Sequence, residues 1–590
     1  MFVRVQRVRQ GRRVYEYVHI VEGYRDEAGK VRHRVVANLG RRDRLKDSGT
    51  LDNLAAAFTR LDPAPGRYLC GPLPLVVPIL KRLDLVGIVD RACPMRGRAH
   101  LTHGEVIAAL VANRLSSPRP LYDVQGWAAA YDAGAWLGTP APLLNDDRLG
   151  RALDAISGRL DEIAGALGLQ AIAAFGVEAA RLHWDFTSVA FCGAYGEQDP
   201  GAPQVVFGHS SDRQAHRRQL KVAQAVTPSG VPLYHRVVSG GRHEGSETGG
   251  LLERLRRLAA PKRLLLVADS ALVTKDNLGA CDQAGICFVA RLPRSFGYEE
   301  VALGLQESCW RRLDYCSERA RRRPRASRPT FLGAEGSVEV ATDQRTTRSL
   351  RVLYVIGSEE RDAARASRAK LLGRAEEELA RIARGLERRP GEDPERLSRR
   401  VAKAVSKGRV GAWLRTEVTS VGGVTTLRWW RDEQAISEAE RRDGLYALVT
   451  NLKPHAASSS RLLRLYKEQV VVERTHHLLK GPLVVRPVFL HSNRRAAALV
   501  AVCSMALMVY GLIESEVRKA IAPRRTMIGL LPEGRSARPT APNIFGTFAG
   551  LGFQRVRTAD GLREILDALT PAQQQILSAI GARSVLPLER

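Results

Sequence analysis

The stretch from residue 462 to residue 482 constrains this chain more than any other part of it. Its apolar residues recur at helical spacing, and Gly481-Pro482 ends the pattern, so one helix is predicted. At about 100° per residue a polar stripe follows one side of that helix. The stripe consists of Tyr466, Gln469, Glu473 and Lys480. A carboxylate among a phenol, an amide and an ammonium suits a metal ion and a phosphodiester, and a solvated helix face is the alternative.

The charge balance points to a polyanionic partner. The 590 residues include 91 Lys and Arg against 62 Asp and Glu, giving a formal charge of +29 and a pI near 10.3. This large excess of positive charge favours a protein that binds nucleic acid over one whose charged surface serves solubility alone. The eight cysteines are scattered and form no CxxC, which argues against a zinc ribbon and for reduced thiols.

One apolar run, Ala496–Ile513, is about long enough to test as a membrane span. It is rich in alanine, contains Cys503 and Tyr510, and has charged residues on both sides. We therefore expect a buried core helix and no membrane association. The N-terminus starts with charged, alternating residues and has no signal-peptide core.

Periodicity and composition divide the chain into six predicted segments. These are a basic β-meander (1–60), a helical domain expected to bind DNA (61–180), the first part of an α/β core (181–295), an insertion (296–440), the return of the core with the Glu473 helix (441–515), and a C-terminal helical region (516–590) with helices at 561–569 and 571–580.

Two predicted strands of the core carry acids. Arg181–Val189 contains Asp185 among apolar neighbours, and the buried run that begins at Arg263 ends in Asp269. Further strands are predicted at Val205–Ser210, 233–238 and 286–291, with a short helix at 251–258. Strands, an apolar strand ending in Asp and a later helix carrying Glu are the order expected of a ribonuclease-H-like mixed-sheet α/β core. The long separation of Asp269 from Glu473 requires the insertion.

Carboxylates gathered in this way have a chemical use. Two divalent cations about 4 Å apart activate a water or a 3′-hydroxyl and stabilise the leaving oxygen of a phosphodiester. Mg²⁺ is held by few carboxylates and keeps waters and substrate oxygens. Each acid alone has a structural alternative, since strands often end in an Asp that caps a turn.

The same residues carry a resemblance to a known family. Tyr466-x2-Gln469-x3-Glu473-x6-Lys480 resembles the Y-x2-R-x3-E-x6-K signature of a group of DDE transposases from bacterial insertion sequences, with Gln469 in place of Arg. That replacement keeps hydrogen-bonding capacity and loses a charge. Further similar segments are 17–24, 184–188, 207–213, 267–270 and 443–451.

The resemblance implies an activity. Asp185, Asp269 and Glu473 would bind two Mg²⁺ or Mn²⁺ ions. The enzyme would cut transposon-end DNA and join the 3′-hydroxyls to target DNA. Tyr466 and Lys480 would hold DNA phosphates. The resemblance also implies a homodimer on the two DNA ends and a place in the bacterial cytoplasm, at the nucleoid.

The remaining site candidates keep their alternatives. His209, Asp212 and Arg213 either contact DNA or stabilise a loop, and His183 either touches the site beside Asp185 or packs there. Asp443 is expected to be a turn residue, and His476 and His477 face different ways on a helix. Trp429-Trp430 either stack on a flipped base or pack in a core, and the Arg-rich run 311–328 either contacts phosphate or is disordered.

Two other functions stay open. One is a ribonuclease-H-like nuclease that hydrolyses DNA without joining it. The other is a catalytically inactive DNA-binding descendant, against which the three intact acids argue.

Overall fold

The structure is a computed structural model of the chain. It describes residues 2–10, 13–25, 31–42, 66–95, 97, 99–193, 195, 199, 201–208, 216–341, 347–389, 391–481, 490, 492–558 and 561–582. The chain divides into two compact units, each described here by itself. Unit 1 comprises Met1–His243 and Val471–Arg590, and unit 2 comprises Glu244–Val470.

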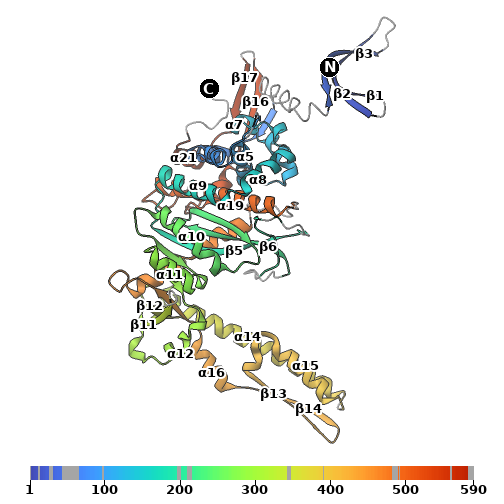
Figure 1. Ribbon diagram of the computed structural model, residues 1–590. Coiled ribbons are helices and arrows are strands. Elements are labelled where there is room, and N and C mark those ends of the chain that lie inside the picture. Colours follow the sequence, from blue (N-terminus) through green and yellow to red (C-terminus); the bar gives the residue numbers. More distant parts are fainter. Residues whose placement is uncertain are drawn as a thin grey trace. The chain divides into compact units, whose positions relative to one another are not determined.

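The chain begins with the predicted β-meander (Figure 1). Strands β1 (Phe2–Gln10), β2 (Arg13–Arg25) and β3 (Val31–Arg41) pair antiparallel in the order β1-β2-β3. Alternating apolar and polar residues form such strands because successive side chains point to opposite faces. Val18 and Val21 are buried, although register shifts interrupt the β2–β3 ladder beside both. Residues 26–30, between β2 and β3, lie outside the described residues.

Helices follow in unit 1, as the sequence predicts. Helix α5 begins with a capping box: the Thr102 hydroxyl accepts from the Glu105 amide at 3.1 Å, and the Thr102 amide donates to the Glu105 carboxylate at 2.7 Å. This is the geometry that Thr and Glu at this spacing form at a helix start. The helices are α3 (Leu73–Arg82), α4 (Leu85–Ala92), α5 (His103–Ser116), α6 (Val124–Ala130), α7 (Ala133–Leu137), α8 (Asp146–Ser157) and α9 (Leu160–Phe175).

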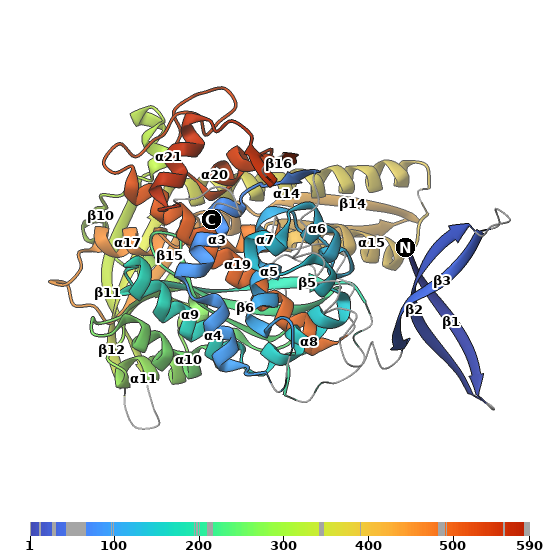
Figure 2. The same ribbon diagram turned by 90° about the horizontal axis from the view of Figure 1, so that it is seen from above.

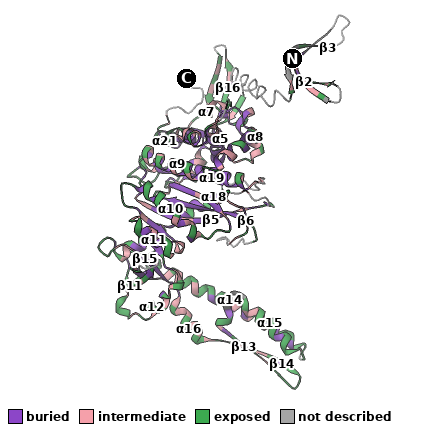
Figure 3. Ribbon diagram, in the orientation of Figure 1, coloured by how far each residue is buried: buried purple, intermediate pink, exposed green. Residues whose placement is uncertain are grey.

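Helix α19 (Asn493–Ala520) is the central element of unit 1. It contacts α3, α5, α8, α9 and strand β7 (Pro232–Ser239). Its most apolar window is 94% buried by the protein itself, so the predicted core helix is confirmed (Figure 3). Gly511 lets the helix approach a loop closely, because an added Cβ would lie 2.8 Å from the Gly230 carbonyl oxygen.

Strands β5 (Arg181–Phe191), β6 (Arg218–Val226) and β7 form an antiparallel ladder in unit 1. The predictions for β5 and β7 are confirmed, and β6 was missed. The strand predicted at Val205–Ser210 is wrong for its described part, where only Val206 forms a bridge, to Gln219 of β6. Strand β6 thus takes the ladder position between β5 and β7. Val206 pairs only with Gln219, near the start of β6.

Unit 2 contains a large mixed sheet with the strand order β10-β11-β12-β15-β9-β8. Strands β8 (Leu265–Ala268) and β9 (Cys287–Arg291) are parallel, and the other neighbours are antiparallel. The remaining strands are β10 (Arg311–Arg312), β11 (Phe331–Ala341), β12 (Thr347–Gly357) and β15 (Leu445–Thr450). The helices of this part are α10 (Glu244–Ala259), α11 (Lys275–Gln283), α12 (Tyr298–Leu303), α13 (Glu318–Arg321) and α17 (Ser459–Lys467).

The segment expected as an insertion divides into two parts. Strands β10–β12 extend the sheet of unit 2, and the rest forms a separate layer. In this layer α14 (Ser358–Glu387) and α15 (Pro394–Ser406) lie alongside the hairpin β13 (Leu414–Val421)–β14 (Val424–Arg431), followed by α16 (Glu433–Arg442) (Figures 1 and 2). Its own apolar cluster includes Leu379, Leu397 and Leu414.

The C-terminal segment contains helices α20 (Ala541–Phe548) and α21 (Pro571–Ala579). The helix predicted at 561–569 is wrong, because Gly561–Leu566 forms strand β17. It pairs with β16 (Gly552–Thr558), which also pairs with β4 (Gly66–Leu69). The backbone N–H and C=O groups of this short segment form hydrogen bonds with β16. Its side chains alternate between more and less exposed positions, as in a strand.

A buried arginine holds this sheet to the helices of unit 1. Arg555 of β16 is 2% exposed and donates to Asp132, at the start of α7, at 2.6 Å and to Glu564 of β17 at 2.5 Å. Its guanidinium also lies 4.8 Å from the centre of the Tyr68 ring. A buried cation needs such partners, because an unpaired charge in the interior is costly.

We predict that Arg555→Met destabilises unit 1 by about 3 kcal/mol, because it leaves two carboxylates without their cation in a buried site. Arg67→Met is the matched control, since Arg67 pairs with Asp567 at 2.8 Å in the same sheet but its side chain is 53% exposed. The control is expected to cost less than about 1 kcal/mol. Urea denaturation followed by circular dichroism measures both, and equal losses would contradict the prediction.

Candidate active site

The segment that carries Glu473 is not one helix. Helix α17 ends at Lys467, residues 468–469 form a turn, and α18 runs from Val470 to Lys480. The prediction of a single helix with one straight polar stripe is therefore wrong. The physical reason is packing: Leu462, Leu463 and Leu465 belong to the core of unit 2, whereas residues from Val471 onward belong to unit 1. Each helix follows its own core, and the turn separates them.

The break divides the predicted stripe. Tyr466 is partly buried against the core of unit 2, with its ring centre 6.3 Å from that of Tyr446. Gln469 is 9% exposed and lies in the turn. Glu473 and Lys480 lie on α18, where Glu473 is exposed and Lys480 half-buried. Only these last two share a helix.

Asp185 lies in the middle of β5. Its neighbours Trp184 and Phe186 are buried, 2% and 7% exposed, and meet edge to face at 5.6 Å. The Asp185 carboxylate accepts the Phe186 amide at 2.8 Å and keeps 23% of its side-chain surface accessible. A strand fixed by apolar neighbours thus presents a carboxylate that solvent still reaches.

A row of polar side chains crosses the sheet from Asp185. Asp185 is opposite Gln224 on β6, and Gln224 is opposite His235 on β7. Residues directly opposite each other in a ladder share a face of the sheet. Gln224 and His235 are 0% and 2% exposed, so the row leads from the accessible carboxylate into the interior.

Helix α18 contacts this row at two points. The Thr475 hydroxyl lies 3.3 Å from the Gln224 side-chain oxygen, and His476 Nδ1 lies 3.7 Å from Asp185 Oδ2. Glu473 is three residues before His476, on the same side of the helix. The structure therefore brings the Glu473 helix and Asp185 together.

Two buried histidines near this row, His476 and His235, are neutral at pH 7. Burial lowers the pKa of His476 to about 3, with a smaller contribution from the charge of Lys480, and burial lowers the pKa of His235 to about 4. A buried imidazole resists protonation because the interior solvates its cation poorly. His476 therefore lies beside Asp185 as a neutral imidazole.

Asp269 belongs to unit 2, immediately after β8. One carboxylate oxygen accepts the Ala271 amide at 3.0 Å, so Asp269 caps a short 3₁₀ turn as the structural alternative expects. Burial raises the pKa of Asp269, and the charge of Glu244 raises it further. A carboxyl group in such surroundings gains from a nearby cation, which stabilises its ionised form.

The donor chemistry of the three acids fits a hard divalent cation. All three offer carboxylate oxygens, the ligands that Mg²⁺ and Mn²⁺ prefer. Within the described residues, no group of three or more His, Cys, Asp or Glu side chains forms a ready-made metal cluster. The remaining ligands would be waters and phosphate oxygens, as Mg²⁺ sites on phosphodiesters normally have.

The structure also places the other candidates. His183 is fully buried, His476 is buried and His477 exposed, and Asp443 forms a buried ion pair with Arg368. Trp429 packs partly against the core of the α14–α15 layer, whereas Trp430 is 51% exposed. Within the Arg-rich run, 318–321 form helix α13. His209, Asp212 and Arg213 lie outside the described residues.

Sequence reasoning missed the contacts that hold α18. Besides Thr475 and His476, Arg474 donates to Glu514 of α19 at 2.5 Å. Glu514 is 5% exposed, pairs with Arg518 at 2.5 Å and accepts the Ala541 amide at the start of α20 at 2.6 Å. The signal in the sequence was a Glu directly after the apolar run of α19, where a buried carboxylate needs a partner.

Parts of the chain match models of known protein families. A model of the transposase DDE domain matches residues 182–509, which is more than half of the chain. The chain therefore belongs to the DDE transposases. Residues 2–64 match the N-terminal domain of IS1634 family transposases, in keeping with a bacterial insertion sequence. Residues 70–160 match a domain of unknown function, DUF4277, and no curated protein matches the chain.

Since DDE transposases act on DNA with divalent cations, DNA cleavage tests the role of Glu514. We predict that Glu514→Gln lowers kcat for cleavage at least about tenfold with little change in DNA affinity, because α18 loses the charge that fixes Arg474 and small misplacements are costly.

Glu516→Gln is the control, since Glu516 lies on the same helix and pairs with Arg82 at 2.7 Å. Its kcat is expected to stay within about twofold. Single-turnover cleavage and a binding titration separate the two effects, and an unchanged kcat in Glu514→Gln would contradict the positioning role.

Proposed function

We propose that this transposase cuts the ends of its element and joins the freed 3′-hydroxyls to target DNA on a ribonuclease-H-like core. One observation carries the proposal: α18, which bears Glu473, contacts Asp185 through His476 at 3.7 Å. This contact supports a site in which a strand acid and a helix acid act together, as two-cation phosphoryl transfer requires.

Asp185, Asp269 and Glu473 would hold two Mg²⁺ or Mn²⁺ ions. When bound, these cations supply charge that stabilises the attacking and leaving oxygens at phosphorus. The chain's own part is to hold the carboxylates in place. His476 beside Asp185 is neutral, and Thr475 ties α18 to Gln224.

Both reactions are in-line displacements. In cutting, water attacks phosphorus and the bond to the 3′-oxygen breaks, which frees a 3′-hydroxyl. In joining, that hydroxyl attacks a target phosphodiester and displaces another 3′-oxygen. Because bonds and charges change alike, one set of carboxylates serves both steps.

Contacts to phosphates would come from side chains flanking the acids. Lys480 ends α18, two turns after Glu473, and binds phosphate as a point charge. Tyr466, Gln469, His209 and Arg213 are assigned the same role on the family signature and the neighbouring motif. Gln469 is nearly buried, so its amide would act only on DNA that reaches into the turn.

The proposed partners and segments follow from this activity. Two copies of the chain would hold the two DNA ends, in the bacterial cytoplasm at the nucleoid. Residues 1–60 and 61–180 would serve DNA binding, 181–295 and 441–515 the catalytic core, 296–440 the insertion, and 516–590 support.

A strand-transfer assay tests the function. Wild-type protein, 3′-hydroxyl end DNA, Mg²⁺ and a supercoiled target are expected to give joined products. A chain that cuts without joining would instead be a nuclease, and one that binds without cutting would be an inactive descendant.

We predict that Asp185→Asn and Asp269→Asn each keep end-DNA binding and lose cleavage by at least about a thousandfold, because an amide cannot replace a carboxylate toward a divalent cation. Gel-shift and cleavage assays on the same preparations measure both. Cleavage at wild-type rates in either variant would remove that residue from the cation site.

We also predict that Lys480→Ala weakens end-DNA binding and makes its dependence on salt shallower, by about 0.9 in the slope of log K against log salt for one lost phosphate contact. The control is Lys370→Ala on α14, an exposed lysine on another helix. An unchanged slope would argue that Lys480 does not touch phosphate.

A further inference from the structure

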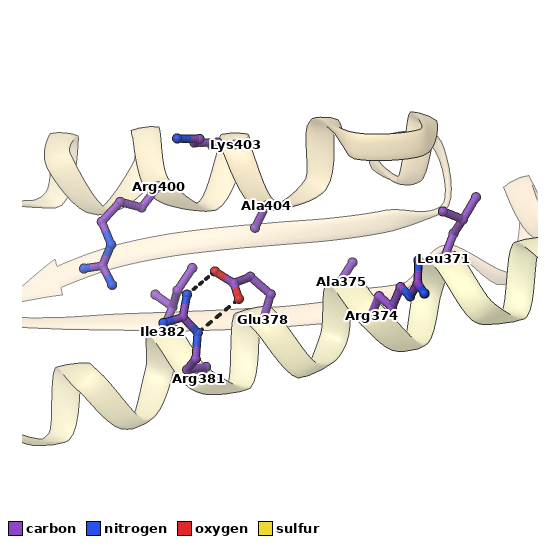
Figure 4. A pocket seen from close by; sticks show the side chains of 9 residues that line it. All are labelled: Leu371, Arg374, Ala375, Glu378, Arg381, Ile382, Arg400, Lys403 and Ala404. Atoms are coloured by element: carbon purple, nitrogen blue, oxygen red, sulfur yellow. Dashed lines mark hydrogen bonds and ion pairs between the residues drawn. The ribbon is translucent and has the colours of Figure 1, made fainter. Parts of the chain in front are cut away.

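A groove lies between α14 and α15, in the layer formed by residues 358–442 of unit 2. It has a volume of about 620 Å³, and its walls come from both helices. Figure 4 shows the lining residues Leu371, Arg374, Ala375, Glu378, Arg381, Ile382, Arg400, Lys403 and Ala404. Four of these side chains are cationic and one is anionic.

The floor of the groove consists of apolar side chains, two of them alanines. Ala375 and Ile382 belong to the buried cluster of this layer, and Leu371 and Ala404 pack against it. Alanines on both helices leave room for a ligand to lie between the charged walls. The hairpin β13–β14 packs against the same two helices, so the groove has a rigid support.

The charges in the groove are unequally compensated. Arg381 pairs with Glu378 at 2.5 Å, as the dashed lines in Figure 4 show, and Arg400 pairs with Glu392 at 2.6 Å. Arg374 and Lys403, one on each wall, form no ion pair with any residue that the structure describes. Both side chains belong to exposed residues. One unpaired cation therefore lies on each wall of the groove, and the only anionic lining residue, Glu378, pairs with Arg381.

The ligand class follows from these features. A small anion is normally held in an enclosed site by a few convergent donors, whereas all four cationic residues here are exposed. Arg374 and Arg381 are two turns apart, roughly 10 Å along α14. Successive phosphates of one strand advance about 3.4 Å along the duplex axis, so the wall matches about three of them.

We propose that the α14–α15 groove binds the sugar-phosphate backbone of duplex DNA, with Arg374 and Lys403 as the phosphate contacts and Arg381 and Arg400 supporting them. This deepens the proposed function, because it gives the insertion layer a DNA-binding role. Its recognition is independent of base sequence, since every contact is to phosphate.

The test compares two double variants of the full-length chain. Arg374→Gln/Lys403→Gln removes the two unpaired cations of the groove. Arg384→Gln/Arg396→Gln removes two exposed cations from the same two helices that do not line the groove. Both variants lose the same net charge, and circular dichroism checks that both remain folded.

Binding is measured without divalent cations, so that no DNA is cut, on a duplex carrying the element's inverted repeat and on a random duplex of equal length. The groove variant is expected to lose on the order of tenfold affinity at 0.15 M salt, and about 1.8 in the slope of log K against log salt for two contacts. The control variant is expected to keep the wild-type slope.

The two duplexes identify the source of the DNA. Loss on both supports a backbone contact that either DNA can make, loss on the repeat alone assigns the groove to end DNA, and loss on the random duplex alone assigns it to target DNA. Equal behaviour of the groove and control variants on both duplexes overturns the proposal. A chain that neither cuts nor joins would overturn the proposed function and leave this result standing.

Discussion

The contact of α18 with the β5–β6 pair is the interaction on which the candidate site depends. Thr475 meets Gln224 and His476 meets Asp185, so one helical turn fixes the helix to the row of polar residues on the sheet. Neither contact is strong by itself. Their effect comes from burial, because Gln224 and His476 are enclosed and have little freedom to rearrange. The position of Glu473 therefore depends on the contacts that Thr475 and His476 make with the sheet.

The ionised groups around α18 divide into two kinds. Glu514 is buried and its charge is matched by Arg474 and Arg518, so it serves structure. Asp185 is partly accessible, and the histidine beside it is neutral. A buried charge held by ion-pair partners and an accessible charge that a ligand can reach are opposite electrostatic states. The same distinction separates Arg555, which three groups enclose, from Arg374 and Lys403 in the groove.

Much of the secondary structure could be predicted, and the failures have physical causes. Strands β5, β7, β8 and β9 and the core helix α19 follow from apolar periodicity alone. Strand β6 was missed and 561–569 was read as a helix because short segments take their state from the strands beside them. The single helix at 462–482 failed for a related reason: its periodicity is helical throughout, but its two halves pack into different cores.

The candidate site shows the same division. The acids Asp185, Asp269 and Glu473 were found from strand ends and spacing, since carboxylates stand out against apolar runs. Gln224 and Thr475 were not, because their partners lie far away in the chain and no local pattern marks them. The turn at 468–469 has a related consequence for the segment from Tyr466 to Lys480: its first half is fixed by the core of unit 2 and its second half by unit 1. The spacing of polar residues along this segment therefore reflects two separate packing requirements, not one helical face.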